Sequence, residues 1–131
     1  MSSQSGKVVK LAYYASTALL IFMMGVGGVL DTLRPASVLE GMATLGYPAY
    51  FPLILGPAKV IGVLALLAPV PAWMREWAYA GFFIDVVAAV ISHLAAGDAA
   101  HVGPAIVGVA LVVVSHTTYH RRLASSVPQR R

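Results

Sequence analysis

Two charged residues stand inside apolar stretches of the sequence and are the first candidates for chemistry. Lys59 interrupts LILGPAKVIGVLALLAP, residues 53–69, and Asp85 lies within the next apolar stretch, residues 77–96. An unpaired charge in the hydrocarbon of a membrane costs at least about 2.5–3.5 kcal/mol, so such residues usually pair or mark a functional site. We therefore expect an ion pair between Lys59 and Asp85. The sequence leaves open whether this pair lines a ligand or proton-relay cavity or only fixes the register of two helices.

A second polar cluster is expected beyond the far end of the stretch that holds Asp85. It combines two imidazoles, up to three carboxylates and a hydroxyl, from Ser92, His93, Asp98, His101, Asp31 and Glu40. These groups could bind a transition metal or relay protons. The spacing His-x4-Asp-x2-His is not a recognised ligand pattern, however, so no metal site is predicted. We expect His93 to make a polar contact within the bundle, Asp98 to cap the last helix and His101 to lie in solvent.

A third cluster is the segment SHTTYHRR, residues 115–122. His116 and His120 are spaced i, i+4 and share a helix face, from which they could ligate haem or a metal in principle. Their position among arginines at the end of an apolar stretch favours anchoring at a membrane interface instead. Near the start of the chain, further polar side chains could join a polar lining, although interfacial tyrosine is the simpler interpretation: Tyr13, Tyr14, Ser16 and Thr17.

The composition is that of a membrane protein. Of the 131 residues, 59% are hydrophobic and 11% are charged, whereas soluble domains are about half apolar and a quarter charged. The chain has room for one domain, residues 1–131, and too much surface to hide this much apolar material from water. It contains no cysteine, which excludes disulfides and thiolate metal sites. The net charge of +4 gathers at the termini and beside apolar stretches, which argues against a nucleic-acid-binding face.

Four apolar stretches approach the length of about 20 residues that crosses the hydrocarbon core. They predict an all-α bundle of four transmembrane helices at residues 11–30, 50–68, 77–96 and 102–119. Lys59 and Asp85 then fall near the midplane, and consecutive spans joined by a short turn are antiparallel neighbours. Residues 35–48 are predicted to be a short amphipathic helix or, equally, a connecting loop; the helix would have one apolar face, formed by Val38, Leu39, Met42 and Leu45.

The distribution of Lys and Arg predicts the orientation of these spans. Most of them fall on one side of a four-span chain: Lys7, Lys10, Arg75, Arg121, Arg122, Arg130 and Arg131. The other side keeps Arg34 among acidic residues, so the positive-inside rule places both termini in the cytoplasm of a bacterial inner membrane. Trp77 and Tyr79 would belong to the inner aromatic belt.

Three segments of the sequence resemble the DoxX-like family of small four-helix membrane proteins. They are TLGYP at residues 44–48, LGPAKVIGVLALLAP around Lys59, and REWAYAGFFIDVVAAVISHLAAGD at residues 75–98. The resemblance places recurring polar or aromatic positions of the family at Lys59, Glu76, Trp77, Asp85, His93 and Asp98. The family takes its name from a subunit of a thiosulfate:quinone oxidoreductase, and other relatives are associated with redox-linked membrane complexes. The resemblance therefore implies a four-helix fold and makes quinone a candidate substrate or partner.

These observations predict a membrane protein whose polar cavity handles a small lipophilic molecule, as a subunit of a quinone-linked oxidoreductase. Two alternatives stay open. One is a stand-alone isomerase, hydrolase or cyclase that acts by general acid/base catalysis on an epoxide or terpenoid, and the other is a small transporter or scaffold. The candidate catalytic residues are Asp85, Lys59 and His93, and the candidate substrate-binding residues are Trp77, Tyr79, Ser92 and Asp98. No resident cofactor or metal is predicted, and the expected partners are the lipid bilayer, the lipophilic molecule, soluble redox subunits and further copies of the chain.

The predicted ion pair carries a mutational expectation. Lys59→Met alone should damage folding or activity, and Lys59→Met with Asp85→Leu should restore folding, because the pair is then removed as a unit. Restored activity in that double variant would contradict a catalytic role.

Overall fold

The computed structural model describes residues 3–128, and over these residues it is helical without any strand. In chain order the elements are α1 Ser3–Leu33, α2 Ala36–Thr44, α3 Phe51–Leu67, α4 Ala72–Ala95, the short 3-10 helix η1 Ala99–His101, and α5 Gly103–Ser126. Each apolar stretch predicted as a span coincides with a long helix. Arg130 and Arg131, which entered the orientation argument, lie outside the described residues.

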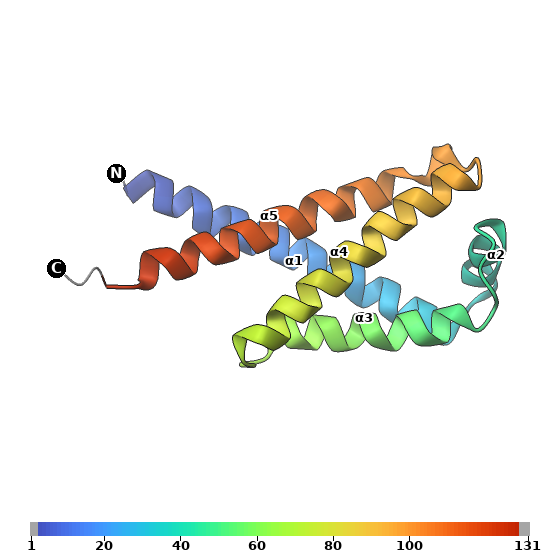
Figure 1. Ribbon diagram of the computed structural model, residues 1–131, viewed down its shortest axis with the longest axis horizontal. Coiled ribbons are helices and arrows are strands. Elements are labelled where there is room, and N and C mark those ends of the chain that lie inside the picture. Colours follow the sequence, from blue (N-terminus) through green and yellow to red (C-terminus); the bar gives the residue numbers. More distant parts are fainter. Residues whose placement is uncertain (1–2, 129–131) are drawn as a thin grey trace.

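The four long helices form a bundle in which each packs against two others (Figure 1). α1 packs against α3 and α5, and α4 also packs against α3 and α5. The start of α1, the end of α5 and the α3–α4 turn lie at one end of the bundle, whereas α2 and the α4–α5 connection lie at the other. The core between the helices is built largely from Leu20, Met24, Phe82, Val86 and Val112. This is the antiparallel order that the sequence predicts.

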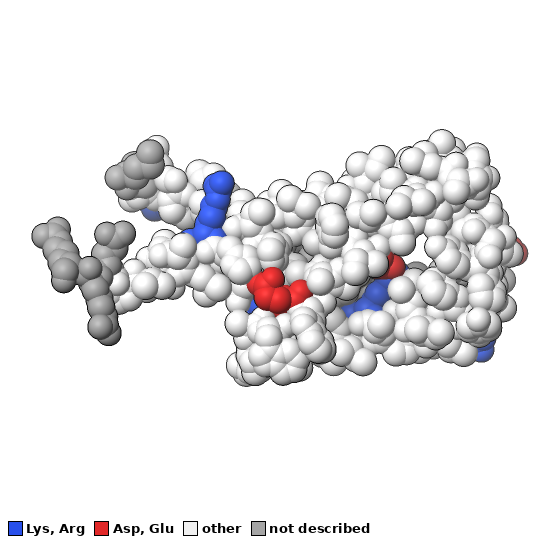
Figure 2. Space-filling model, viewed as in Figure 1, with Lys and Arg blue, Asp and Glu red and all other residues white. Residues whose placement is uncertain are grey.

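The outside of the bundle is apolar along most of its length. α1 and α4 are long and apolar enough to cross a membrane, whereas α3 is apolar but has 17 residues, and the polar second half of α5 lowers its hydropathy. Large side chains more than half exposed occur on every long helix, for example Phe22, Ile54, Ile84 and Ile106. Figure 2 shows one face with few charged side chains. Such an exterior is unusual for a soluble monomer and typical of a chain that faces lipid.

The segment predicted as either helix or loop is the helix α2. The less exposed side chains of α2 and of Leu45, which directly follows it, are the four that share the predicted apolar face, at positions 38, 39, 42 and 45. The remaining residues of α2 are exposed. α2 touches α3 and covers the end of the bundle at the right of Figure 1. The amphipathic pattern in the sequence therefore corresponds to a helix whose apolar face is turned toward the protein.

Glycines end both α2 and α4 and shape the connections at this end of the bundle. Gly46 and Gly97 have φ angles of +82° and +72°, in the left-handed region that favours glycine. After each glycine the chain folds back, because the N–H groups of Tyr47 and Asp98 each donate a 2.8 Å hydrogen bond to the carbonyl five residues earlier. These turns place the side chains of Tyr47 and Asp98 beside the last turn of α4.

α1 and α3 approach closely where Gly28 lies against Gly56. A carbon added at Gly56 would lie 2.5 Å from Thr32 Oγ1 and 2.7 Å from the Gly28 carbonyl oxygen, and one added at Gly28 would lie 2.9 Å from Lys59 Cβ. Small residues at such a crossing let two membrane helices pack backbone to backbone. The crossing also brings Lys59 over α1, which matters for the site described below.

We predict that Gly56→Ala destabilises the bundle by about 1–3 kcal/mol, the usual effect of forcing extra volume into a packed contact. Thermal unfolding of the purified protein in detergent measures this as a lowered midpoint. Gly25→Ala on α1 is the matched control, because a carbon added there meets nothing within 4 Å. Equal midpoints for the two variants would contradict the close crossing.

Candidate functional site

Lys59 lies at the centre of an interhelical cluster of three charged side chains. Its Nζ lies 2.9 Å from Asp31 Oδ2, where it donates a hydrogen bond, and 3.5 Å from Asp85 Oδ2. The three side chains come from α3, α1 and α4, and each is at most 17% exposed. The predicted pairing of Lys59 with Asp85 is confirmed, but the nearer partner is Asp31, which was expected in the cluster around His93.

Two local features bring these groups together. The short turn between α3 and α4 makes the two helices antiparallel neighbours, so Lys59 and Asp85 face each other across them. On the α1 side, Gly28 has no side chain to obstruct the lysine: a carbon added there would lie 2.9 Å from Lys59 Cβ. α1 also continues to Leu33, beyond the apolar stretch that ends at residue 30, so Asp31 belongs to the helix and is buried.

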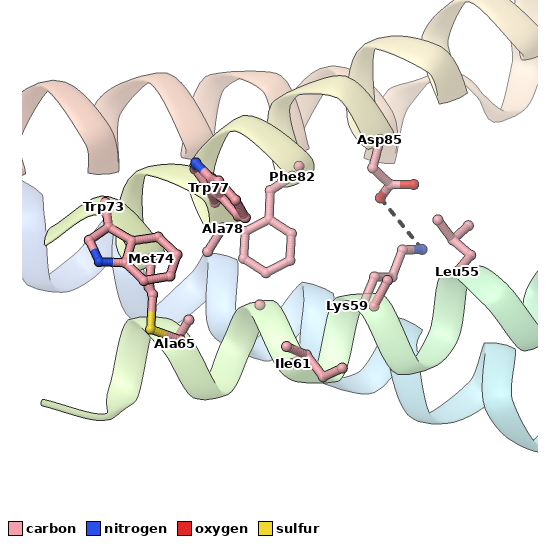
Figure 3. A pocket seen from close by; sticks show the side chains of 13 residues that line it. Leu55, Lys59, Ile61, Ala65, Trp73, Met74, Trp77, Ala78, Phe82 and Asp85 are labelled. Atoms are coloured by element: carbon pink, nitrogen blue, oxygen red, sulfur yellow. Dashed lines mark ion pairs between the residues drawn. The ribbon is translucent and has the colours of Figure 1, made fainter. Parts of the chain in front are cut away.

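An apolar groove of about 470 Å³ runs between α3 and α4 and reaches this cluster. Figure 3 shows Lys59 and Asp85 at one end of the groove, with Phe82 and Trp77 between the two helices and Trp73 toward the α3–α4 turn. Trp77 is 73% exposed, so the groove opens at the surface of the bundle. Both tryptophans of the chain line it. The groove thus combines aromatic walls with a charged end, a composition typical of sites for small apolar ligands with a polar head.

A second cavity, of about 310 Å³, lies on the other side of the ion pair, toward α2. Lys59 and Asp85 line both spaces, and the second one extends past Tyr47 to His93 and His101. The cluster therefore stands between an apolar groove and a cavity that contains imidazoles. This second cavity is lined by all three predicted catalytic residues, Asp85, Lys59 and His93.

The cluster around His93 is organised by one carboxylate. Asp98 Oδ2 lies 2.9 Å from His93 Nδ1, and Asp98 Oδ1 lies 2.5 Å from His101 Nδ1. These hydrogen bonds lower the pKa of Asp98 below its ordinary value, and the one with His101 has the larger effect. The carboxylate is therefore ionised at neutral pH. The prediction that Asp98 caps the last helix is wrong: the residue before α5 is Val102, without a side-chain cap, because the Asp98 carboxylate is taken up by the histidines.

Other predicted residues are distributed around the bundle. His101 is largely exposed, as expected, and Ser92 binds the Tyr47 hydroxyl at 2.6 Å. Tyr79, expected at the interface and as a substrate-binding residue, is instead 3% exposed and points away from the groove. Its hydroxyl lies 2.8 Å from Ser115 Oγ, which lies 2.6 Å from Thr17 Oγ1.

This buried hydroxyl network joins α4, α5 and α1 through Tyr79, Ser115 and Thr17. Buried polar groups are stable when each finds a partner, and here all three hydroxyls do. Thr17 was expected in a polar lining, whereas Ser115, the first residue of the segment SHTTYHRR, was not expected to join it. The signal in the sequence was that Ser115 is a small hydroxyl residue within an apolar stretch, where its hydroxyl needs a partner.

The fold and the site together define a helical membrane protein with a charged cluster inside its bundle. The profile of the DoxX-like family matches residues 15–115, which includes all three members of the Lys59 cluster. The chain therefore belongs to the DoxX-like family of membrane proteins. No curated protein and no solved structure shows a significant match to it.

Proposed function

We propose that this DoxX-like protein crosses a bacterial inner membrane four times and binds a quinone in the groove between α3 and α4, as the membrane subunit of a quinone-linked oxidoreductase. One observation carries the proposal: an interhelical lysine–carboxylate pair forms the end of an aromatic groove that opens at the apolar surface of the bundle. A quinone has the matching chemistry, because it is a lipophilic ring with carbonyl oxygens at its edge.

The groove offers a complementary contact for each part of such a molecule. Trp77 and Phe82 present aromatic surface to a ring and to an attached hydrocarbon chain. The Lys59 ammonium can donate a hydrogen bond to a carbonyl oxygen, and charge-assisted hydrogen bonds are the stronger kind. Asp85, at 3.5 Å from the ammonium, is the looser of the two carboxylate partners and is available to a ligand hydroxyl.

The second cavity is suited to supplying the protons that quinone reduction requires. Reduction of a quinone to a quinol takes up two electrons and two protons. Two carboxylates and one ammonium carry a formal charge of −1 when all are ionised, so the cluster becomes neutral on taking up one proton. The cavity that joins Asp85 to His93 provides a route from imidazoles near the end of the bundle. The proposal assigns electron supply to a soluble partner subunit.

The arrangement of the bundle supports the proposed topology. The start of α1, the end of α5 and the α3–α4 turn lie at one end, and that end carries Lys7, Lys10, Arg75 and Arg121. A cytoplasmic location of this end satisfies the positive-inside rule. Lipid-facing apolar side chains on all four long helices support four crossings rather than two.

We predict that the purified protein in detergent binds a short-chain quinone with saturable quenching of its tryptophan fluorescence, since both tryptophans line the groove. Gly81→Leu should weaken the binding at least about tenfold, because Gly81 lines the groove and a carbon added there meets nothing within 4 Å. Filling the groove in this way leaves the ion pair in place. Titration of fluorescence against quinone concentration measures the effect.

Two controls accompany this titration. Gly25→Leu, on α1 and outside the groove, should bind like the unaltered protein. An alkylbenzene with the same chain but no carbonyl should displace the bound quinone only at a much higher concentration, because it lacks the hydrogen bond to Lys59. Equal quinone affinity in both glycine variants would contradict binding in the groove, and turnover of an epoxide by the purified protein alone would favour the stand-alone enzyme instead.

A further inference from the structure

A second cluster of ionisable side chains, apart from Lys59, lies where α4 and α5 face each other near the α3–α4 end of the bundle. Glu76 on α4 meets two histidines of α5. Its Oε2 lies 2.8 Å from His116 Nε2 and its Oε1 lies 2.6 Å from His120 Nε2. These donor atoms all lie within 4.8 Å of one another. One carboxylate thus holds two imidazole nitrogens at its two oxygens.

The rings are held in position by their neighbours. His116 and His120 are spaced i, i+4 on one face of α5, with ring centroids 4.6 Å apart. The His116 ring packs edge-on against Tyr79 at 5.1 Å, and the His120 ring against Tyr119 at 5.3 Å. Tyr79 is itself fixed through Ser115. Both imidazoles are therefore directed toward Glu76 before any ligand arrives, which is the condition for a preorganised site.

We propose that Glu76, His116 and His120 form a binding site for a divalent first-row transition metal of the zinc type. Two imidazole nitrogens and one carboxylate are a common ligand set for such ions, with a further position left for water or substrate. A tetrahedral ion with ligands at about 2.0–2.2 Å requires donor atoms about 3.3 Å apart. The two hydrogen-bonded distances need to open by about 0.5–0.7 Å, and the two imidazole nitrogens, which lie within 4.8 Å of each other, need to reach the same separation.

The site is reachable and its surroundings tolerate a cation. The three side chains are between 37% and 50% exposed, so an ion can enter from solution. Arg75, which precedes Glu76 in the chain, is directed elsewhere: its Nη2 donates to the Ala68 carbonyl at 3.1 Å and its guanidinium lies over the Tyr119 ring. Glu76 and His116 also line a cavity of about 360 Å³ with Tyr79, where a molecule bound at the open position would find room.

Cobalt(II) titration tests this site with a readout other than activity. The full-length protein is purified through a tag without histidine, stripped with a chelator and titrated with Co(II) in detergent. We expect visible absorption bands of a four- or five-coordinate ion that saturate near one equivalent and disappear when Zn(II) is added. His120→Gln and Glu76→Gln should each weaken the apparent affinity at least about tenfold. His101→Gln, at the other end of the bundle, is the matched control and should leave the titration unchanged.

Three outcomes would overturn the proposal: no cobalt spectrum at millimolar metal, an unchanged titration in Glu76→Gln, or loss of binding in His101→Gln. Elution as the same species in size exclusion confirms that each variant is folded. Two ligand variants are compared so that the test still holds if one of them does not fold. The three ligands line none of the groove between α3 and α4, so quinone binding and metal binding succeed or fail independently.

Discussion

Replacing Lys59 with methionine should destabilise the protein more than any other single substitution considered. The change removes the only cation within 4 Å of Asp31 and Asp85 among the residues that the structure describes, and it leaves two neighbouring carboxylates without compensation. Removing one partner of a buried ion pair typically costs about 3–5 kcal/mol. We expect Lys59→Met to accumulate poorly in membranes and to unfold at a markedly lower temperature in detergent.

Lys10→Met is the matched control for this experiment. Lys10 lies on α1, is exposed and belongs to the charged end of the bundle, so its replacement should leave the unfolding temperature within the scatter of surface substitutions. If Lys59→Met and Lys10→Met unfold alike, Lys59 does not hold the two carboxylates, and its position inside the bundle would have to be revised.

A variant without charges at the cluster should fold again but no longer bind quinone. Asp31→Leu, Lys59→Met and Asp85→Leu together replace the ammonium and both carboxylates with apolar side chains of similar size. Because replacing a whole buried ionic cluster is often neutral or stabilising, we expect unfolding near that of the unaltered protein. The groove keeps its aromatic walls but loses its hydrogen-bonding end, so the affinity should fall at least about tenfold.

The structure changes the design of this experiment relative to the sequence. From sequence alone, Lys59→Met with Asp85→Leu was expected to restore folding. Asp31 is the nearer partner, with its oxygen 2.9 Å from Lys59 Nζ, and in that double variant it would remain buried and unpaired. We now expect the double variant to stay destabilised and the triple variant to recover, and comparison of their unfolding temperatures measures the contribution of Asp31.

The sequence was sufficient to predict contacts between helices that are joined by a short turn. Lys59 and Asp85 could be paired because two apolar stretches separated by a tight turn must run antiparallel, which leaves little freedom in their register. The fold class followed in the same way from apolar periodicity, whereas the sequence left residues 35–48 open between a helix and a loop. DoxX-like membership, inferred from the segments around Lys59 and Asp85, is confirmed by the family match over residues 15–115.

Contacts that depend on how two helices cross could not be predicted from the sequence in that way. Asp31 lies just after the first apolar stretch and was therefore expected in the connection that follows it. The helix instead continues through Asp31 to Leu33. Its approach to Lys59 depends on the Gly28–Gly56 crossing, which apolar periodicity does not encode. Glu76 and the histidines of α5 were noted separately, because pairing them requires the relative rotation of α4 and α5. Tyr79 shows the same limit, since an interfacial and a buried tyrosine look alike in sequence.

The most direct test of a quinone site at the Lys59 cluster is a fluorescence titration of two proteins side by side in the same detergent. One is the unaltered protein and the other is the Asp31→Leu, Lys59→Met, Asp85→Leu variant. Both keep the two tryptophans of the groove, so both report a bound quinone. The site predicts saturable quenching in the unaltered protein and at least tenfold weaker binding in the folded variant. Equal affinity in the two proteins would show that the charged cluster does not recognise the ligand and would contradict the proposed function.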